Sequence, residues 1–207
     1  MKENKCEGIV LKSYAFKETE RILHLFTPDQ GIIHLIVKHL SPKKPQRVNL
    51  ATPLCQGQYL YRQGKSDLYS FIDGSILDMH LPLRQSLEKL TIGGKMLQAI
   101  HDSQMPEKPA PKLYQLLSAY LKKLPLAPVA IWTSFQLKLL KHEGLISFEK
   151  PYIKSANGTH ALSSDEWSHF LLLLESRDFS TITTFTPPES LQKSVEDIFS
   201  SFIKTSP

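Results

Sequence analysis

The sequence has little cysteine and lacks long hydrophobic runs. Cys6 and Cys55 are its two cysteines, too few for the disulfide framework of a small secreted domain or for a four-thiolate zinc site. The longest run of aliphatic and aromatic side chains lies near Phe170–Leu174, far short of the roughly 20 residues that cross a bilayer. The charged first residues do not resemble a secretory signal. We therefore expect a cytoplasmic protein without membrane contact.

Motifs of nucleotide hydrolysis and of common hydrolytic catalysis are also missing. The Gly-Gly-Lys segment at 93–95 lacks the upstream glycine and the following hydroxyl of a phosphate-binding loop. His142 has no second histidine at zincin spacing, and His101, beside an aspartate, has no serine elbow to serve. Both histidines are interpreted as solvated helix surface. The sequence therefore predicts no catalytic residue, no cofactor and no enzymatic activity.

Three further histidines, His24, His34 and His39, are spaced by 10 and 5 residues. They have no neighbouring carboxylate or thiolate in the sequence to complete a metal site. We interpret them as surface or half-buried strand residues, and we expect no bound metal.

Acidic residues are absent from the segment 30–66, although the whole chain has 25 Lys and Arg against 20 Asp and Glu. A surface that meets phosphate has a physical reason to exclude carboxylates, which would repel it. A solvated basic loop would have the same composition, so this pattern alone leaves both interpretations open. The positive charges of the segment are Lys38, Lys43, Lys44, Arg47, Arg62 and Lys65.

The first ~80 residues have the pattern of short β-strands. Thr27–Gly31 combines proline, aspartate and glycine and predicts a tight turn. Five strands before any strong helix predict a small barrel, and the OB-fold is a five-stranded barrel that binds oligonucleotides. The predicted strands are Gly8–Tyr14, Arg21–Phe26, Gly31–Lys38, Leu54–Arg62 and Asp67–Leu77.

After Pro82 the hydrophobic period becomes helical. We expect an α+β protein, with an OB-fold-like barrel over residues 1–80 and an all-helical domain over 81–207. Asn157-Gly158 predicts a short hairpin within 151–162. Ser163 and Glu166 form a capping-box pattern, and Thr186 begins a similar one. Helices are predicted over about 83–97, 113–124 and 128–143 and after each of the two caps. The expected apolar stripe of the first helix consists of Leu83, Leu87, Leu90 and Leu97. Gly94 lies in this stripe, where we expect another backbone to approach closely.

Aromatic residues alternate along the last two predicted strands. Exposed on a barrel face, they would stack bases, but alternation fits a buried core equally well. We favour the core for most of them. The residues are Tyr59, Tyr61, Tyr69 and Phe71.

The segment from Gly8 to Lys38 resembles the start of the RecO family. A strand is followed by a turn with Glu18, an apolar strand, Thr27 spaced four residues before Gly31, and another strand. The helix end from Phe135 to Gly144 is similar to the family's Phe-x-x-x-Leu-Leu-x-x-x-Gly pattern. Pro53 after Leu50, and Gly64 in a hairpin, also fit the family order.

The chain departs from the family pattern at several points. Glu20 stands where relatives usually have aspartate, and residues 38–41 lack the glycine and arginine of the family's basic run. The segment 149–162 contains no cysteine, so the four-cysteine zinc module of many relatives is replaced by the short hairpin. We therefore expect no zinc.

The resemblance implies a recombination mediator in DNA repair. Such a protein binds single- and double-stranded DNA, anneals complementary strands, and acts with RecR to load RecA onto single strands coated with single-stranded-DNA-binding protein (SSB). It also implies a helical-region pocket for the SSB C-terminal tail. The residues expected to contact DNA are Arg21, Lys38, His39, Lys43, Lys44, Arg47, Arg62 and Lys65.

Two alternatives remain open from the sequence. One is a general OB-fold module that binds DNA or RNA, with helices that only oligomerise. The other is a structural adaptor whose basic loop has no role in binding.

Overall fold

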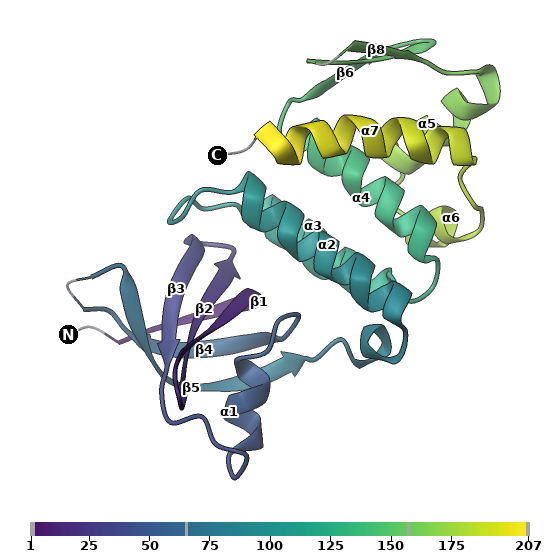
Figure 1. The fold of residues 1–207 in the computed structure, drawn as a ribbon. Coiled ribbons are helices and arrows are strands. Elements are labelled where there is room, and N and C mark those ends of the chain that lie inside the picture. The colour runs from purple at the N-terminus through teal and green to yellow at the C-terminus, as the bar shows by residue number, and fades with distance from the viewer. Residues whose placement is uncertain (1–2, 65, 157, 206–207) are drawn as a thin grey trace. The chain divides into compact units, whose positions relative to one another are not determined.

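The computed structural model describes residues 3–64, 66–156 and 158–205. The chain forms two compact units, Met1–Leu121 and Lys122–Pro207. The first contains a closed barrel, a short helix beside it and two longer helices (Figure 1). The second contains helices and a small sheet. Among the described residues, no helix has the length and apolar character needed to span a membrane.

Five strands close the barrel in the order β1-β2-β3-β5-β4. All neighbouring pairs are antiparallel except β3 and β5, which are parallel. This arrangement confirms the expected five-stranded OB-fold-like barrel. The strands are β1 (Glu3–Lys17), β2 (Glu20–Thr27), β3 (Gly31–Val37), β4 (Gln56–Arg62) and β5 (Leu68–Asp78).

The barrel interior is filled by alternate side chains of its strands. Leu23 and Leu25 of β2, and Leu35 of β3, are fully buried. The aromatic residues of β4 and β5 also enter this core, which confirms the interpretation favoured from the sequence. Exposed fractions are 0% for Tyr59, 1% for Tyr61, 6% for Tyr69 and 8% for Phe71.

A short helix, α1 (Pro45–Leu50), lies between β3 and β4 and was not predicted. Its first residue is proline, which suits a first helical position because that position needs no backbone N–H donor. Six residues are too few to show a helical period in a sequence. Leu50 is nevertheless 2% exposed and belongs to the barrel core, so tertiary packing holds this helix in place.

Two longer helices complete the first unit: α2 (Leu87–Ser103), after the 3-10 turn η1 (Leu81–Gln85), and α3 (Pro111–Lys123). The Tyr114 hydroxyl of α3 donates to Glu7 Oε1 of β1 at 2.9 Å, and its ring lies 5.8 Å from that of Phe26. Gln56 of β4 donates to the same Glu7 oxygen at 2.8 Å. These contacts attach α3 to the barrel.

The loop between α2 and α3 also contacts the barrel. The backbone N–H of Glu107 donates to the Ile32 carbonyl at 3.1 Å, and the Tyr69 hydroxyl donates to the Glu107 carboxylate at 2.7 Å. Gly31 adopts φ +65°, and a side chain there would meet the Lys108 carbonyl oxygen. Glycine is therefore required both by the backbone conformation and by the close approach of this loop.

The second unit is built around α4 (Pro128–His142), which packs against three other helices. Trp132 Nε1 and Gln136 Nε2 both donate to the carboxylate of Glu196, at 3.3 and 2.6 Å. The surrounding helices are α5 (Ser164–Glu175), α6 (Phe179–Thr183) and α7 (Glu189–Thr205), and the small sheet is β6 (Ile146–Glu149), β7 (Tyr152–Ser155) and β8 (Gly158–Ala161). Ser163 and Glu166 form the predicted capping box at the start of α5.

Several local expectations need correction. The hairpin expected within 151–162 is present as β7 and β8, but β6 also pairs with β7 and makes it a three-stranded sheet; Asn157 lies outside the described residues. Helix α2 begins only at Leu87, because Ser86 caps it. Leu87, expected in the apolar stripe of this helix, is 82% exposed. Among the described residues, nothing lies within 4 Å of a Cβ placed at Gly94, so the expected close approach of another segment is not found there.

The predicted domain boundary at residue 80 lies just after the last barrel strand. The first compact unit nevertheless continues to Leu121, since α2 and α3 group with the barrel. Contacts of α2 with β1, and the hydrogen bonds of α3 described above, explain this grouping. The division into a barrel domain and a helical domain stays a prediction.

Candidate nucleic-acid interface

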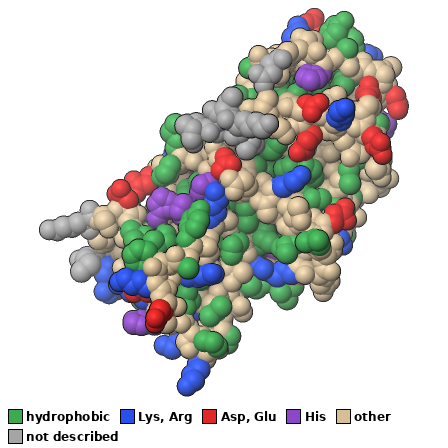
Figure 2. All heavy atoms as spheres, viewed as in Figure 1, with side chains coloured by type: hydrophobic (Ala, Val, Ile, Leu, Met, Phe, Trp, Pro, Cys, Tyr) green, Lys and Arg blue, Asp and Glu red, His purple; other side chains and the backbone are tan. Residues whose placement is uncertain are grey.

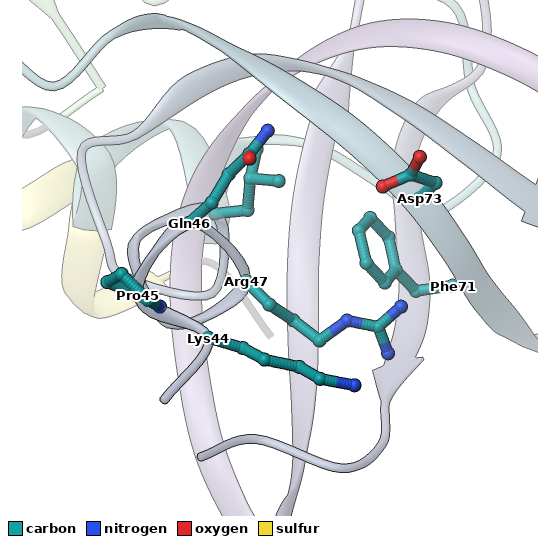
Figure 3. Close-up of a pocket in the computed structure, with 7 residues that line it drawn as sticks. Lys44, Pro45, Gln46, Arg47, Phe71 and Asp73 are labelled. Carbon is teal, nitrogen blue, oxygen red and sulfur yellow. The ribbon is translucent and has the colours of Figure 1, made fainter. Parts of the chain in front are cut away.

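The segment 30–66, which has no acidic residue, contains a loop on the outside of the barrel. We call residues 38–44 the basic loop. Lys38, Lys43 and Lys44 are all exposed. Beside the loop, a hollow of about 430 Å³ opens between α1 and β5. In Figure 3, the side chains of Lys44 and Arg47 extend from α1 toward β5, and the Arg47 guanidinium ends beside Phe71, with Asp73 close by on the same strand. Two cations thus border a cavity that also carries one carboxylate.

Arg47 is held by the protein itself. Its guanidinium donates to the Lys38 carbonyl at 2.9 Å and to the Ile72 carbonyl at 2.6 Å. The guanidinium carbon also lies 5.1 Å from the centre of the Phe71 ring, a cation–π contact. Arg47 therefore ties α1 to the end of β3 and to β5. Its positive charge still borders the hollow, but its hydrogen bonds show a structural role, because they hold the start of the basic loop against α1 and β5.

A second hollow, of about 470 Å³, lies between the β1–β2 turn and the basic loop. Arg21 lines it together with Leu40 and Val48. Glu18 and Glu20 also line it, and Glu20 lies 3.9 Å from the Lys17 ammonium. The structure thus places Arg21 next to the basic loop, with carboxylates close by.

The remaining predicted contacts are more dispersed. His39 is exposed, with its backbone in the left-handed region at φ 57°. Arg62 forms an ion pair of 2.7 Å with Glu3, its cross-strand partner on β1. Lys65 lies outside the described residues. The structure therefore assembles the basic loop, Arg47 and Arg21 around α1, and it gives Arg62 a carboxylate partner of its own.

Sequence reasoning missed a cluster of histidines. His24 of β2 and His34 of β3 are cross-strand partners with ring centres 4.3 Å apart. His101, from the end of α2, places its Nε2 2.8 Å from His24 Nδ1. Because His24 and His101 are 77 residues apart in the sequence, no local sequence pattern predicts this contact. The interpretation of His101 as solvated surface was therefore wrong.

Hydrogen bonds and burial both act on the rings of this cluster. His101 Nδ1 lies 3.0 Å from Asp102 Oδ1, and a carboxylate can only accept, so His101 Nδ1 carries the proton. His24 Nδ1 and His101 Nε2, 2.8 Å apart, share a second hydrogen bond, and which of the two donates depends on the tautomers of the rings. Burial, together with the neighbouring His34, His101 and Lys12, lowers the pKa of His24 to about 4. Burial and His101 also lower the pKa of His34.

The cluster is not arranged as a metal site. Among the described residues, no group of three or more His, Cys, Asp and Glu has the arrangement needed to hold a metal ion.

Comparison with known proteins connects this barrel to one family. The family model described as "Recombination protein O N terminal" matches residues 1–80, which is the whole barrel. A DNA repair protein RecO of Clostridium perfringens is 31% identical over 140 residues, 66% of this chain. The chain belongs to the RecO family.

The extent of the similarity differs among RecO proteins. The aligned region covers 56% of the C. perfringens protein and 56% of that of Chlamydia pneumoniae, which is 30% identical over 141 residues. The chain thus spans somewhat more than half of these curated relatives. The RecO protein of Chlamydia muridarum is 23% identical over 221 residues, which cover 95% of this chain and 94% of the relative.

Proposed function

We propose that this protein binds DNA through its barrel and acts as a recombination mediator in DNA repair. In this proposal it binds single- and double-stranded DNA, anneals complementary strands, and works with RecR to load RecA onto SSB-coated strands. Annealing requires charge neutralisation and strand alignment without breaking covalent bonds. The protein accordingly needs no catalytic residue and is proposed not to be an enzyme.

The basic loop carries this proposal. Three exposed lysines project from a segment without a single carboxylate, next to a hollow on a small barrel. Lysines that neutralise phosphates release counterions, which gives binding that weakens with salt and depends little on sequence. The RecO relatives are named DNA repair proteins, which also supports a role in DNA repair.

The decisive variant is Lys43→Glu/Lys44→Glu, with Arg47 left intact because it braces the loop. Reversing two exposed charges should weaken binding to a fluorescent single strand by roughly tenfold or more at low salt. The slope of log affinity against log salt should fall by about 1.4, since each lost phosphate contact removes about 0.7 for single strands. Fluorescence anisotropy at several salt concentrations measures both values.

A matched control changes the same charge elsewhere. Lys122 and Lys123 are adjacent, exposed lysines in the last turn of α3, so Lys122→Glu/Lys123→Glu alters net charge identically. This control should retain most of the affinity. Equal losses in both double variants would mean that net charge, and not the basic loop, governs binding. Annealing of SSB-coated complementary strands then tests the mediator activity with the same three proteins.

The second unit offers a candidate for partner binding. A small hollow of about 90 Å³ lies among α4, the β6–β8 sheet and α7, with mainly apolar walls that include Leu140, Leu145 and Phe202. We propose this hollow as the place where the apolar end of the SSB tail binds, because apolar side chains bind best in such desolvated pockets.

A further inference from the structure

Helix α2 presents an apolar strip to solvent. Leu87, its first residue, is 82% exposed, and Leu90 and Gly94 are exposed as well. The opposite side of the helix is buried and includes Met96 and Ile100. Residues three, four and seven apart lie on one side of a helix. Leu87, Leu90 and Gly94 therefore share one side of α2, and we call these three residues the α2 strip.

The α2 strip has a shape that scattered surface leucines lack. Apolar side chains reach the surface of most proteins singly, and Figure 2 shows hydrophobic side chains at several places among charged ones. In the strip, two leucines stand beside a glycine. Among the described residues, nothing lies within 4 Å of a Cβ placed at Gly94. Glycine weakens a helix interior, and here it leaves a notch open to a side chain from outside.

Two charged residues beside the α2 strip are placed for pairing with a reversed copy of the same helix. Glu88 and Lys95 are both exposed and, being seven residues apart, lie along the same edge of the strip. Glu88 is in the first turn of α2, and Lys95 is near its middle. When a second α2 runs in the opposite direction, Glu88 of each copy lies toward Lys95 of the other. An interface with two-fold symmetry requires such self-complementarity.

One antiparallel register satisfies both the apolar and the charged residues. When Leu87 of one copy lies opposite Gly94 of the other, the two-fold axis passes between residues 90 and 91, so the two Leu90 side chains meet beside it. Glu88 and Lys95 of the other copy are then offset by two residues, about 3 Å along the helix. Two such long side chains span this offset easily. The antiparallel direction also sets the helix dipoles favourably.

We propose that two copies of this chain associate through α2, as an antiparallel pair in which Leu87 of each copy enters the notch at Gly94 of the other. One helix pair buries less surface than the roughly 1,200 Å² of a standard stable interface, so the dimer is weak, with a Kd of about 10 µM. Because α2 belongs to the same compact unit as the barrel, a dimer carries two barrels and two basic loops. That consequence rests on the proposed function, but the pairing itself does not.

Sedimentation of the full chain without DNA measures the pairing. Between about 1 and 200 µM, the average mass should rise reversibly from one chain toward two. Leu87→Gln should weaken the dimer by roughly 100-fold, because each dimer loses two buried leucines that are each worth about tenfold or more. Gly94→Gln should abolish the dimer by filling the notch, yet raise the melting temperature, because glutamine forms helices better than glycine. Misfolding would lower both quantities together.

Exchanging the charges tests the antiparallel register. Glu88→Lys and Lys95→Glu each place like charges opposite one another in a homodimer, so each variant alone should remain monomeric. Mixed in equal amounts, they should form a heterodimer, because both charge pairs are then complementary. Met105→Gln is the control: it removes an apolar side chain that is 67% exposed in the loop after α2, and it should dimerise like the native protein.

The outcomes separate the pairing from the proposed function. A native chain that stays monomeric over the whole concentration range, native-like dimerisation of Gly94→Gln, or no heterodimer from the mixed charge variants would overturn the pairing. Gly94→Gln should bind a short single strand as tightly as the native protein. Failure of both proteins to bind that strand would contradict the proposed function and leave the pairing unaffected.

Discussion

Arg47 provides a direct test of whether a predicted phosphate contact is instead a structural brace. Replacing it by alanine removes a hydrogen bond to the Lys38 carbonyl, one to the Ile72 carbonyl, and the contact with Phe71. Hydrogen bonds from charged donors contribute about 1.5–3 kcal/mol each, and we take the low end for the exposed bond to Lys38. The cation–π contact adds about 0.5–1 kcal/mol.

The barrel should therefore lose about 3 kcal/mol of stability in Arg47→Ala, after allowance for the half-buried position of the side chain. Arg47→Lys should lose about 2 kcal/mol, because an ammonium group cannot form the planar fork that reaches two carbonyls. Lys43→Ala is the matched control: its side chain is exposed, and a change of at most about 0.5 kcal/mol is expected.

The assay must follow the barrel by itself. Both tryptophans of the chain, Trp132 and Trp167, lie in the second unit, so tryptophan fluorescence reports on that unit. Amide hydrogen exchange in β3 and β5 reports on the barrel, where a loss of about 3 kcal/mol accelerates exchange by roughly 100-fold. A destabilisation below about 1 kcal/mol, together with a large loss of DNA affinity, would refute the brace and restore Arg47 as a phosphate contact.

Two other predictions concern the barrel and its pH response. Gly31→Ala should lower the free energy of unfolding by about 3 kcal/mol, measured by urea denaturation, because φ +65° disfavours a side chain and the new Cβ would lie 2.1 Å from the Lys108 carbonyl oxygen. Its control, Gly64→Ala, has open space around the new Cβ and should be nearly neutral in the same measurement. His24 has a pKa of about 4 in the folded protein, against 6.5 for an unperturbed histidine. As the pH falls, the unfolded chain therefore takes up a proton at His24 before the folded protein does. The free energy of unfolding should then fall between about pH 6.5 and pH 4. Solvent screening of this half-exposed ring limits the loss to about 1 kcal/mol, and a urea series that gives the same pH slope for His24→Gln would contradict it.

The barrel could be predicted because each of its strands has a local signature. Alternating apolar residues, and the proline and glycine between Thr27 and Gly31, indicate strands and a turn over a few residues. The predicted strands overlap the observed ones, although β1 begins at Glu3 and not at Gly8. Charged residues at the start of β1 conceal the first part of this strand, whose pairing only the partner strand β4 provides.

The candidate site was predictable in composition but not in geometry. The absence of carboxylates from 30–66 is a property of the sequence, and the exposed lysines of the basic loop follow from it. Helix α1 is too short to leave a periodic pattern, so the brace made by Arg47 could not be anticipated. Similarly, the ion pair between Arg62 and Glu3 depends on the pairing of β1 with β4.

By itself, the sequence determined the class of fold, the buried aromatic core of the barrel, the capped helix α5 and the position of the basic loop. Each depends on neighbours a few residues apart, where hydrogen-bonding and hydrophobic periods act directly. Only the tertiary structure decided that His101 meets His24 across 77 residues, and that Tyr14 is left exposed beside them. Such contacts arise from the closure of the barrel and the packing of α2, which no local pattern encodes.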